Sequence, residues 1–112
     1  MQIRKTYMQV NPELLYAEIR DFALKQGVNL AESSMETYIL PDQSADFISR
    51  GNLNFTCKNE GKQCLQAHIV GTARAETKLI LDIDESLFPQ EKINALESDM
   101  DFIFGEYEDK EQ

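Results

Sequence analysis

The sequence contains no tryptophan, a single histidine, and only two cysteines. Cys57, Cys64 and His68 fall short of the four ligands of a structural zinc site, and two cysteines make no disulfide framework. No hydrophobic run approaches the roughly 20 residues of a membrane-spanning helix, and the first residues form no hydrophobic signal-peptide core. We therefore expect a cytoplasmic protein that does not bind a membrane.

Basic residues are scarce in the last quarter of the chain. Residues 84–112 hold ten acidic side chains against Lys92 and Lys110, whereas residues 1–83 are almost balanced, with ten acidic and nine basic side chains. An acidic surface repels the phosphates of nucleic acids and anionic membranes. We therefore expect no nucleic acid partner, and a protein partner, if it is charged, should be basic.

The 112 residues are enough for one folded domain with a modest core. We expect a single α+β domain over residues 1–107, as a monomer or a homodimer. Residues 108–112 are polar and mostly charged, which is typical of a disordered acidic tail.

The first elements follow from local signals. Residues 2–10 are rich in strand-forming residues. Asn11 and Pro12 form a helix start, because the asparagine can cap free N–H groups and proline suits the first helical position. Hydrophobic residues at helical spacing up to Gly27 predict a helix over residues 12–26. Residues 28–32 and 35–40 look like two short strands or one bent strand, and residues 41–44 like a turn.

Three further strands are predicted over residues 47–57, 63–71 and 78–83, from hydrophobic side chains at alternate positions. A three-residue loop at 59–61, with Gly61 in the left-handed conformation, would place Phe55 opposite Leu65. In that register Cys57 lies opposite Gln63 and points inward, while Cys64 points to the polar face. We thus expect two free thiols, with Cys57 buried and Cys64 more accessible.

A long helix is predicted over residues 89–107 from hydrophobic residues at spacings of three and four. Its inner stripe would be Ile93, Leu96, Met100, Ile103 and Tyr107. The fold class is therefore α+β: a mainly antiparallel sheet in β-α-β(4-5)-α order, with the long C-terminal helix packed on one face.

This order of elements resembles the helix-grip arrangement of the START/Bet v1-like (SRPBCC) superfamily and of the shorter TATA-binding-protein-like fold. Residues 10–22, with Asn11-Pro12 between a strand and an amphipathic helix, look like the SRPBCC opening. The resemblance implies a sheet curved around the last helix, with a cavity for a small hydrophobic ligand in many relatives. It carries over no catalytic residue, because members of such folds differ widely in activity.

Motifs for catalysis and metal binding are weak. Asp42, Glu76 and Lys78 have the residue types of a metal-dependent nuclease, but two predicted strands separate the two acids. Asp82 and Asp84 could begin a calcium loop, yet the glycine and the glutamate that such a loop needs are absent. His68 has no adjacent nucleophile. We expect no metal site, no cofactor and no catalytic residue.

Two groups of residues remain as candidate binding sites. Small side chains on the inner sheet face would leave room for a hydrophobic ligand, and acidic side chains on the last helix would face a partner. The hypotheses, in order, are a non-enzymatic binding protein, a helix-grip carrier or cyclase-like enzyme for a small hydrophobic ligand, and an acidic nucleic-acid mimic that inhibits a DNA-binding protein. The cavity candidates are Gly51, Leu53, Phe55, Ala67, Ile69, Met100 and Ile103, and the acidic candidates are Glu97, Asp99, Asp101 and Glu106.

Overall fold

The computed structural model of the chain describes residues 1–39, 47–59, 61–72 and 75–109. The predicted turn at 41–44 lies outside these residues. Within them the chain is α+β in β-α-β4-α order, as the sequence predicted. The elements are β1 (Gln2–Met8), α1 (Pro12–Lys25), β2 (Asn29–Ile39), β3 (Phe47–Thr56), β4 (Gln63–Gly71), β5 (Glu76–Ile83), α2 (Gln90–Phe104) and a short 3₁₀ turn (Gly105–Tyr107).

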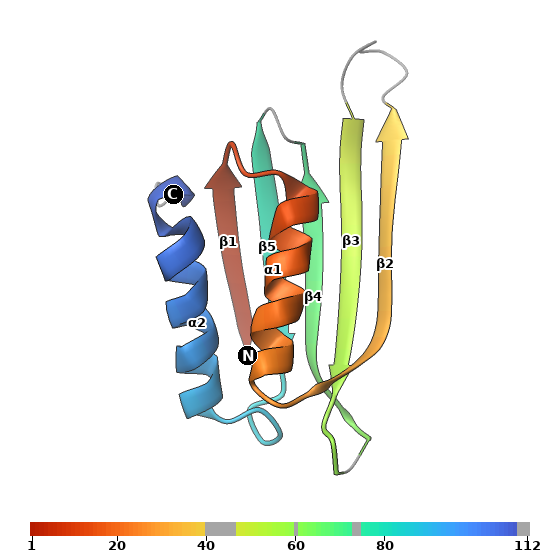
Figure 1. The fold of residues 1–112 in the computed structure, drawn as a ribbon, viewed down its shortest axis with the longest axis vertical. Coiled ribbons are helices and arrows are strands. Elements are labelled where there is room, and N and C mark those ends of the chain that lie inside the picture. Colours follow the sequence, from red (N-terminus) through yellow and green to blue (C-terminus); the bar gives the residue numbers. More distant parts are fainter. Residues whose placement is uncertain (40–46, 60, 73–74, 110–112) are drawn as a thin grey trace.

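The five strands form one antiparallel sheet in the order β1-β5-β4-β3-β2. Strands β2 to β5 follow one another as neighbours, and β1 returns to pair with β5. Both helices lie on the same face of this sheet, α2 beside β1 and α1 across its middle (Figure 1). The two edges of the sheet are therefore β1, next to α2, and β2, which is farthest from α2.

Helix α1 begins as its sequence predicts. The Asn11 side-chain oxygen accepts a hydrogen bond from the N–H of Glu13 at 2.8 Å, and Pro12 occupies the first turn. Gly27, with φ of +90°, ends the helix in the left-handed conformation that glycine adopts without a steric cost. The helix buries Leu15, Ile19 and Ala23 against the sheet.

Helix α2 ends at Phe104, before the predicted end, so that Tyr107 lies in the following 3₁₀ turn and is 43% exposed instead of completing the buried stripe. The stripe also differs from its predicted phase by one residue at its end. Ile93, Leu96 and Met100 are buried as expected, but Ile103 is 41% exposed and Phe104 is buried in its place. The predicted stripe continued three residues after Met100, at Ile103. In the structure it continues four residues after Met100, at Phe104. Phe104 reaches the sheet because its ring packs on Tyr7 of β1.

The predicted pairing of Phe55 with Leu65 is confirmed, and Gly61 has φ of +66° as expected. The predicted three-residue loop is wrong, because the Cys57 N–H donates to the Lys62 carbonyl and four residues, 58–61, separate these two. The predicted burial of the two cysteines is reversed. A β-bulge between Phe55 and Thr56 sets Thr56, and not Cys57, opposite Gln63, so that Cys64 is the extra residue. Both cysteines are free, with Cys64 buried and Cys57 partly exposed.

Candidate interaction surfaces

The space between helices and sheet is filled at the positions expected to line a ligand cavity. Leu53, Phe55, Ala67, Ile69 and Met100 are buried in the core, while Ile103 lies partly in solvent. The space over Gly51 is taken by neighbouring side chains, because a Cβ placed there would lie 2.6 Å from Tyr16 Cδ2 and 2.9 Å from Met35 Cε. Glycine at this position therefore accommodates Tyr16 and Met35.

The acidic candidates on α2 lie on different sides of the helix. Glu97 and Asp101 are four residues apart and share the side near Tyr7, where their charges contribute to raising the pKa of its hydroxyl. Asp99 points toward α1, and its carboxylate accepts from Lys25 Nζ at 3.1 Å. Phe102, which is 87% exposed, interrupts the acidic surface. Glu106 is exposed beyond the helix end.

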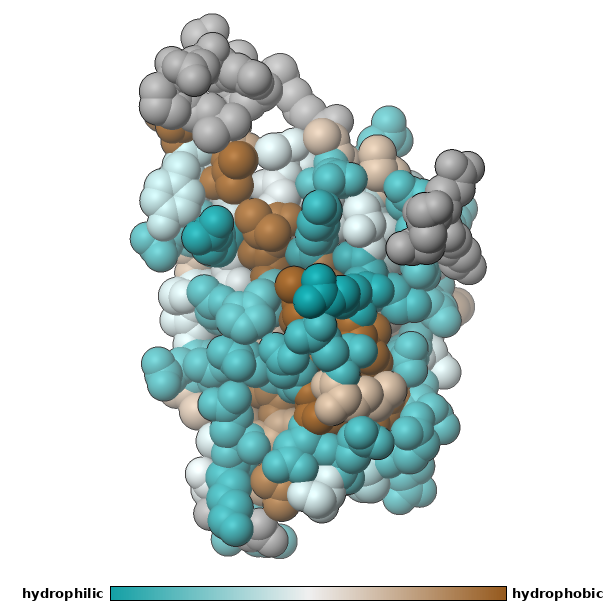
Figure 2. All heavy atoms as spheres, turned by 180° about the vertical axis from the view of Figure 1, so that it is seen from behind, coloured by the Kyte–Doolittle hydropathy of each residue, from teal (hydrophilic) through white to brown (hydrophobic). Residues whose placement is uncertain are grey.

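The sheet face opposite the helices is uncovered (Figure 2). It is mostly hydrophilic, and half-buried Ile48, Val70 and Ile80 contribute hydrophobic groups among the polar ones. His68 Nδ1 is hydrogen-bonded to the Asn52 side-chain oxygen across the β3–β4 pair. This bond orients the imidazole ring.

The weak metal motifs gain no support from the described residues. Asp42 lies outside them, and Lys78 Nζ pairs with Glu76 at 3.6 Å. The Asp84 side chain accepts from both the N–H and the hydroxyl of Ser86, and these hydrogen bonds lower the pKa of Asp84. Asp84 thus stabilises a turn. In the described part of the chain no three His, Cys, Asp or Glu side chains group to hold a metal ion.

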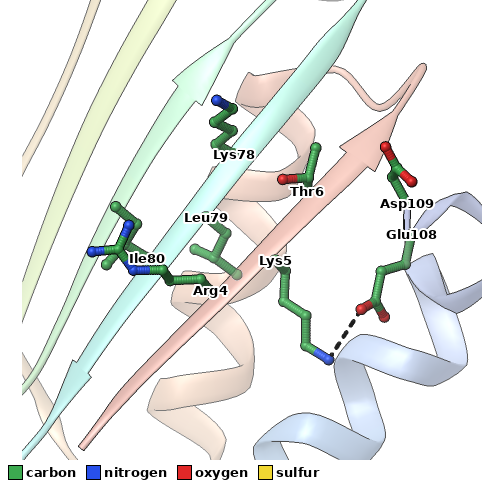
Figure 3. Close-up of a pocket in the computed structure, with 8 residues that line it drawn as sticks. All are labelled: Arg4, Lys5, Thr6, Lys78, Leu79, Ile80, Glu108 and Asp109. Carbon is green, nitrogen blue, oxygen red and sulfur yellow. Dashed lines mark hydrogen bonds and ion pairs between the residues drawn. The ribbon is translucent and has the colours of Figure 1, made fainter. Parts of the chain in front are cut away.

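Residues near the C-terminus pair with the last part of β1 at the edge of the sheet (Figure 3). Glu108 forms a β-bridge with Tyr7, and the N–H of Asp109 donates to the Thr6 carbonyl at 2.8 Å. Lys5 Nζ also pairs with Glu108 at 3.3 Å, where both side chains are largely shielded from water. Glu108 and Asp109 are therefore ordered, although the sequence assigned them to a disordered tail.

A hollow of about 370 Å³ lies beside this edge. Two of its charged side chains, Lys5 and Glu108, neutralise each other, and Arg4 Nε donates to the Gln2 side-chain oxygen at 2.7 Å. Its lining residues, drawn in Figure 3, are Arg4, Lys5, Thr6, Lys78, Leu79, Ile80, Glu108 and Asp109.

The β2 edge is open. Strand β2 is 11 residues long and pairs with β3 alone. The backbone N–H and C=O groups of alternate residues therefore point away from the sheet, where they can pair with another strand. Natural edge strands are protected by lysine, proline or a short length. Strand β2 has no lysine and no proline, and its only such protections are Glu32, Glu36 and a β-bulge between Leu30 and Glu32, all of which leave residues 33–35 and 37–39 uncharged.

Large hydrophobic side chains are exposed where β2 and β3 extend past the helices (Figure 1). Ile39 is 65% exposed and lies opposite Phe47, which is 53% exposed. Tyr38, opposite Ile48, is also exposed, and a hydrogen bond with Glu36 raises the pKa of its hydroxyl. Since side chains alternate along a strand, Ile39 and Phe47 lie on the helix side of the sheet, and Tyr38 and Ile48 lie on its uncovered face. Aromatic and aliphatic side chains thus flank the end of the open edge on both faces, and exposed groups of this kind are typical of a protein-binding surface. We call Tyr38, Ile39, Phe47 and Ile48 the ribbon cluster.

Local patterns place Tyr38 and Ile39 in a predicted strand over residues 35–40, and Phe47 and Ile48 in the strand over residues 47–57, but they do not show which strand is an edge. One available signal was the poor alternation of residues 29–39, which contrasts with the clean alternation of β3 and β4. Only the strand order shows that β2 is an edge.

No helix in the described residues is long and apolar enough to cross a membrane. Comparisons with protein-family models, curated proteins and solved structures gave no match.

Proposed function

We propose that this protein is a non-enzymatic interaction domain that binds a polypeptide partner along the open edge of β2 and at the ribbon cluster. The observation that carries the proposal is the asymmetry of the two sheet edges. Residues 108 and 109 pair with β1, whereas β2 leaves a full strand length unpaired beside exposed Ile39 and Phe47. Addition of a strand to such an edge is a common mode of peptide recognition.

The two other hypotheses have less support. A carrier for a hydrophobic ligand needs interior space, and Tyr16 and Met35 occupy the space over Gly51. A nucleic-acid mimic needs its carboxylates free on one surface, and Asp99 is paired with Lys25. The helix-grip resemblance remains a proposal about ancestry and adds nothing to the choice of surface.

Site-specific photo-cross-linking in host cells tests the proposal. A photoreactive phenylalanine analogue replaces Phe47 in one variant and Leu14 of α1 in the other. Leu14 is a matched control, because it is 52% exposed but lies in the helix layer. We expect polypeptide adducts several times more abundant from position 47. Equal or absent adducts at the two positions would refute binding at the ribbon cluster.

A further inference from the structure

We infer that the polypeptide bound along β2 is a second copy of this chain, paired antiparallel through β2 about a two-fold axis at Met35. This inference rests on the proposed function and names its partner. The two five-stranded sheets would join into one sheet of ten strands, with all four helices on the same face.

The first step is the number of edges available. A chain with two fully open edges could add further copies without limit, but here Glu108 and Asp109 pair with the last part of β1 and leave only its first residues, 2–5, without a described partner strand on that side. In the described sheet, β2 is therefore the one edge strand that is unpaired over its whole outward length. Self-pairing through one open edge uses the same surface on both copies, so that assembly closes at two.

The second step concerns charge. Residues 84–112 contain ten of the twenty acidic side chains and only two of the eleven basic ones. These residues include α2, which lies beside β1, at the edge of the sheet that is opposite the β2 edge (Figure 1). Two copies that meet at β2 therefore keep their most acidic segments far apart. At physiological ionic strength, charges separated by more than about 8 Å are largely screened.

The third step sets the register. In an antiparallel pair, two directly opposed residues have their side chains on the same face of the sheet. A two-fold axis that passes between the two copies of one residue therefore places odd-numbered residues of one copy opposite odd-numbered residues of the other, and even opposite even. A register centred on Ser34 would oppose Glu32 to Glu36, and one centred on Glu36 would oppose that residue to itself. Opposed like charges are destabilising. The register centred on Met35 avoids both arrangements.

The Met35 register also suits the rest of the strand. The β-bulge of β2 lies between Leu30 and Glu32, so the regular run extends from Glu32 to Ile39, and Met35 is near its centre. Across the axis Ser34 would face Glu36 of the other copy, and Glu32 would face Tyr38. Met35 would meet its own counterpart on the helix side, where its side chain already packs over Gly51.

Sedimentation equilibrium of the full chain and three variants tests the inference. Ser34→Glu would oppose two pairs of like charges across the axis, and Ser34→Lys would oppose two pairs of unlike charges. Ser34 is exposed and faces neutral Asn52 within the chain, so neither change should disturb the fold. Ser98→Glu is the matched control, because it adds the same charge at an exposed serine of α2.

We expect a reversible dimer whose dissociation constant is roughly 2- to 30-fold weaker in Ser34→Glu, by the usual cost of two such pairs. Ser34→Lys should tighten it, and Ser98→Glu should match the parent. A parent chain that stays monomeric up to about 1 mM overturns the inference, because a dissociation constant of that size corresponds to a binding free energy of only about −4 kcal/mol. A dimer that is insensitive to both changes at Ser34 overturns it too.

Disulfide trapping tests the register independently. Met35→Cys should form a covalent dimer with oxidised glutathione, because each new thiol lies opposite its own counterpart. Tyr38→Cys should not, since its two copies would be about 20 Å apart at 3.3 Å per residue. The parent chain controls for the native cysteines. Equal trapping at both positions, or trapping at Tyr38 alone, refutes the register.

The outcomes separate this inference from the proposed function. Adducts from position 47 that join the chain to a different polypeptide, with a monomeric purified chain, refute the homodimer and leave the proposed function standing. Absence of both adducts and dimer refutes both.

Discussion

The ring of Tyr7 on β1 packs against the ring of Phe104 on α2, with centroids 5.7 Å apart and planes inclined by 54°. Both side chains are buried, and the Tyr7 hydroxyl has no hydrogen-bond partner among the residues that the structure describes. Burial of an unpaired hydroxyl costs about 1–3 kcal/mol. Tyr7→Phe keeps the ring contact and removes this cost, so the free energy of unfolding in urea should rise. A clear loss of stability would reveal a hydrogen bond of the hydroxyl.

The same hydroxyl makes stability depend on pH in the alkaline range. Burial, and then the charge of Glu108, raise the pKa of Tyr7 above its ordinary value. The folded state therefore holds a proton that the unfolded state releases above about pH 10. The free energy of unfolding should fall by up to about 1.4 kcal/mol per pH unit above that point. Urea midpoints at pH 9 and 11 should diverge less in Tyr7→Phe than in the parent, and equal losses would contradict the assignment.

The phase of α2 is tested by two neighbouring truncations. Phe104→Ala removes a buried ring and should cost about 3–5 kcal/mol of unfolding free energy. Ile103→Ala removes a side chain that is partly exposed, and should cost under about 1.5 kcal/mol. Similar costs for the two variants, measured by chemical unfolding, would restore Ile103 to the core stripe.

The two thiols should differ in reactivity. Burial is the main cause that raises the pKa of Cys64 to about 12, with a smaller contribution from Cys57. Because the thiolate is the reactive form, Cys64 should resist labelling at pH 8 until the protein unfolds. Cys57, which is partly exposed, should react first. Thiol titration of the Cys57→Ser variant should show no fast phase; a fast phase that persists in this variant would contradict the buried position of Cys64.

Gly51 and Gly71 both lie where neighbouring atoms leave no room for a Cβ atom, but the neighbouring atoms differ in kind. A Cβ at Gly71 would lie 2.5 Å from Thr77 Cα, which is backbone, whereas a Cβ at Gly51 meets only the side chains of Tyr16 and Met35. Side chains can move more readily than a paired strand. Gly71→Ala should therefore destabilise the protein more than Gly51→Ala, with both costs on the order of 1–3 kcal/mol. Thermal unfolding of both variants measures the difference, and the reverse order would contradict the packing.

Local patterns in the sequence were sufficient for the elements and for one strand register. Alternating hydrophobic residues and a glycine-containing loop predicted Phe55 opposite Leu65, because a slip by one residue would expose the core face. The exposure of Cys64 could not be predicted, since one bulge residue reverses the alternation. The choice between Ile103 and Phe104 depended on Tyr7, which is distant in sequence. The open edge depended on the return of β1 to β5, a pairing that no local pattern specifies.

Amide hydrogen exchange at two protein concentrations tests most directly the claim that the protein binds through the open edge of β2. In a dimer joined at β2, outward N–H groups between residues 31 and 39 gain partners, and their exchange slows. We predict that protection of this segment increases with concentration, while that of β1, at the opposite edge of the sheet, stays unchanged. Exchange of residues 31–39 that is the same at both concentrations, or a change confined to α2, would contradict the account.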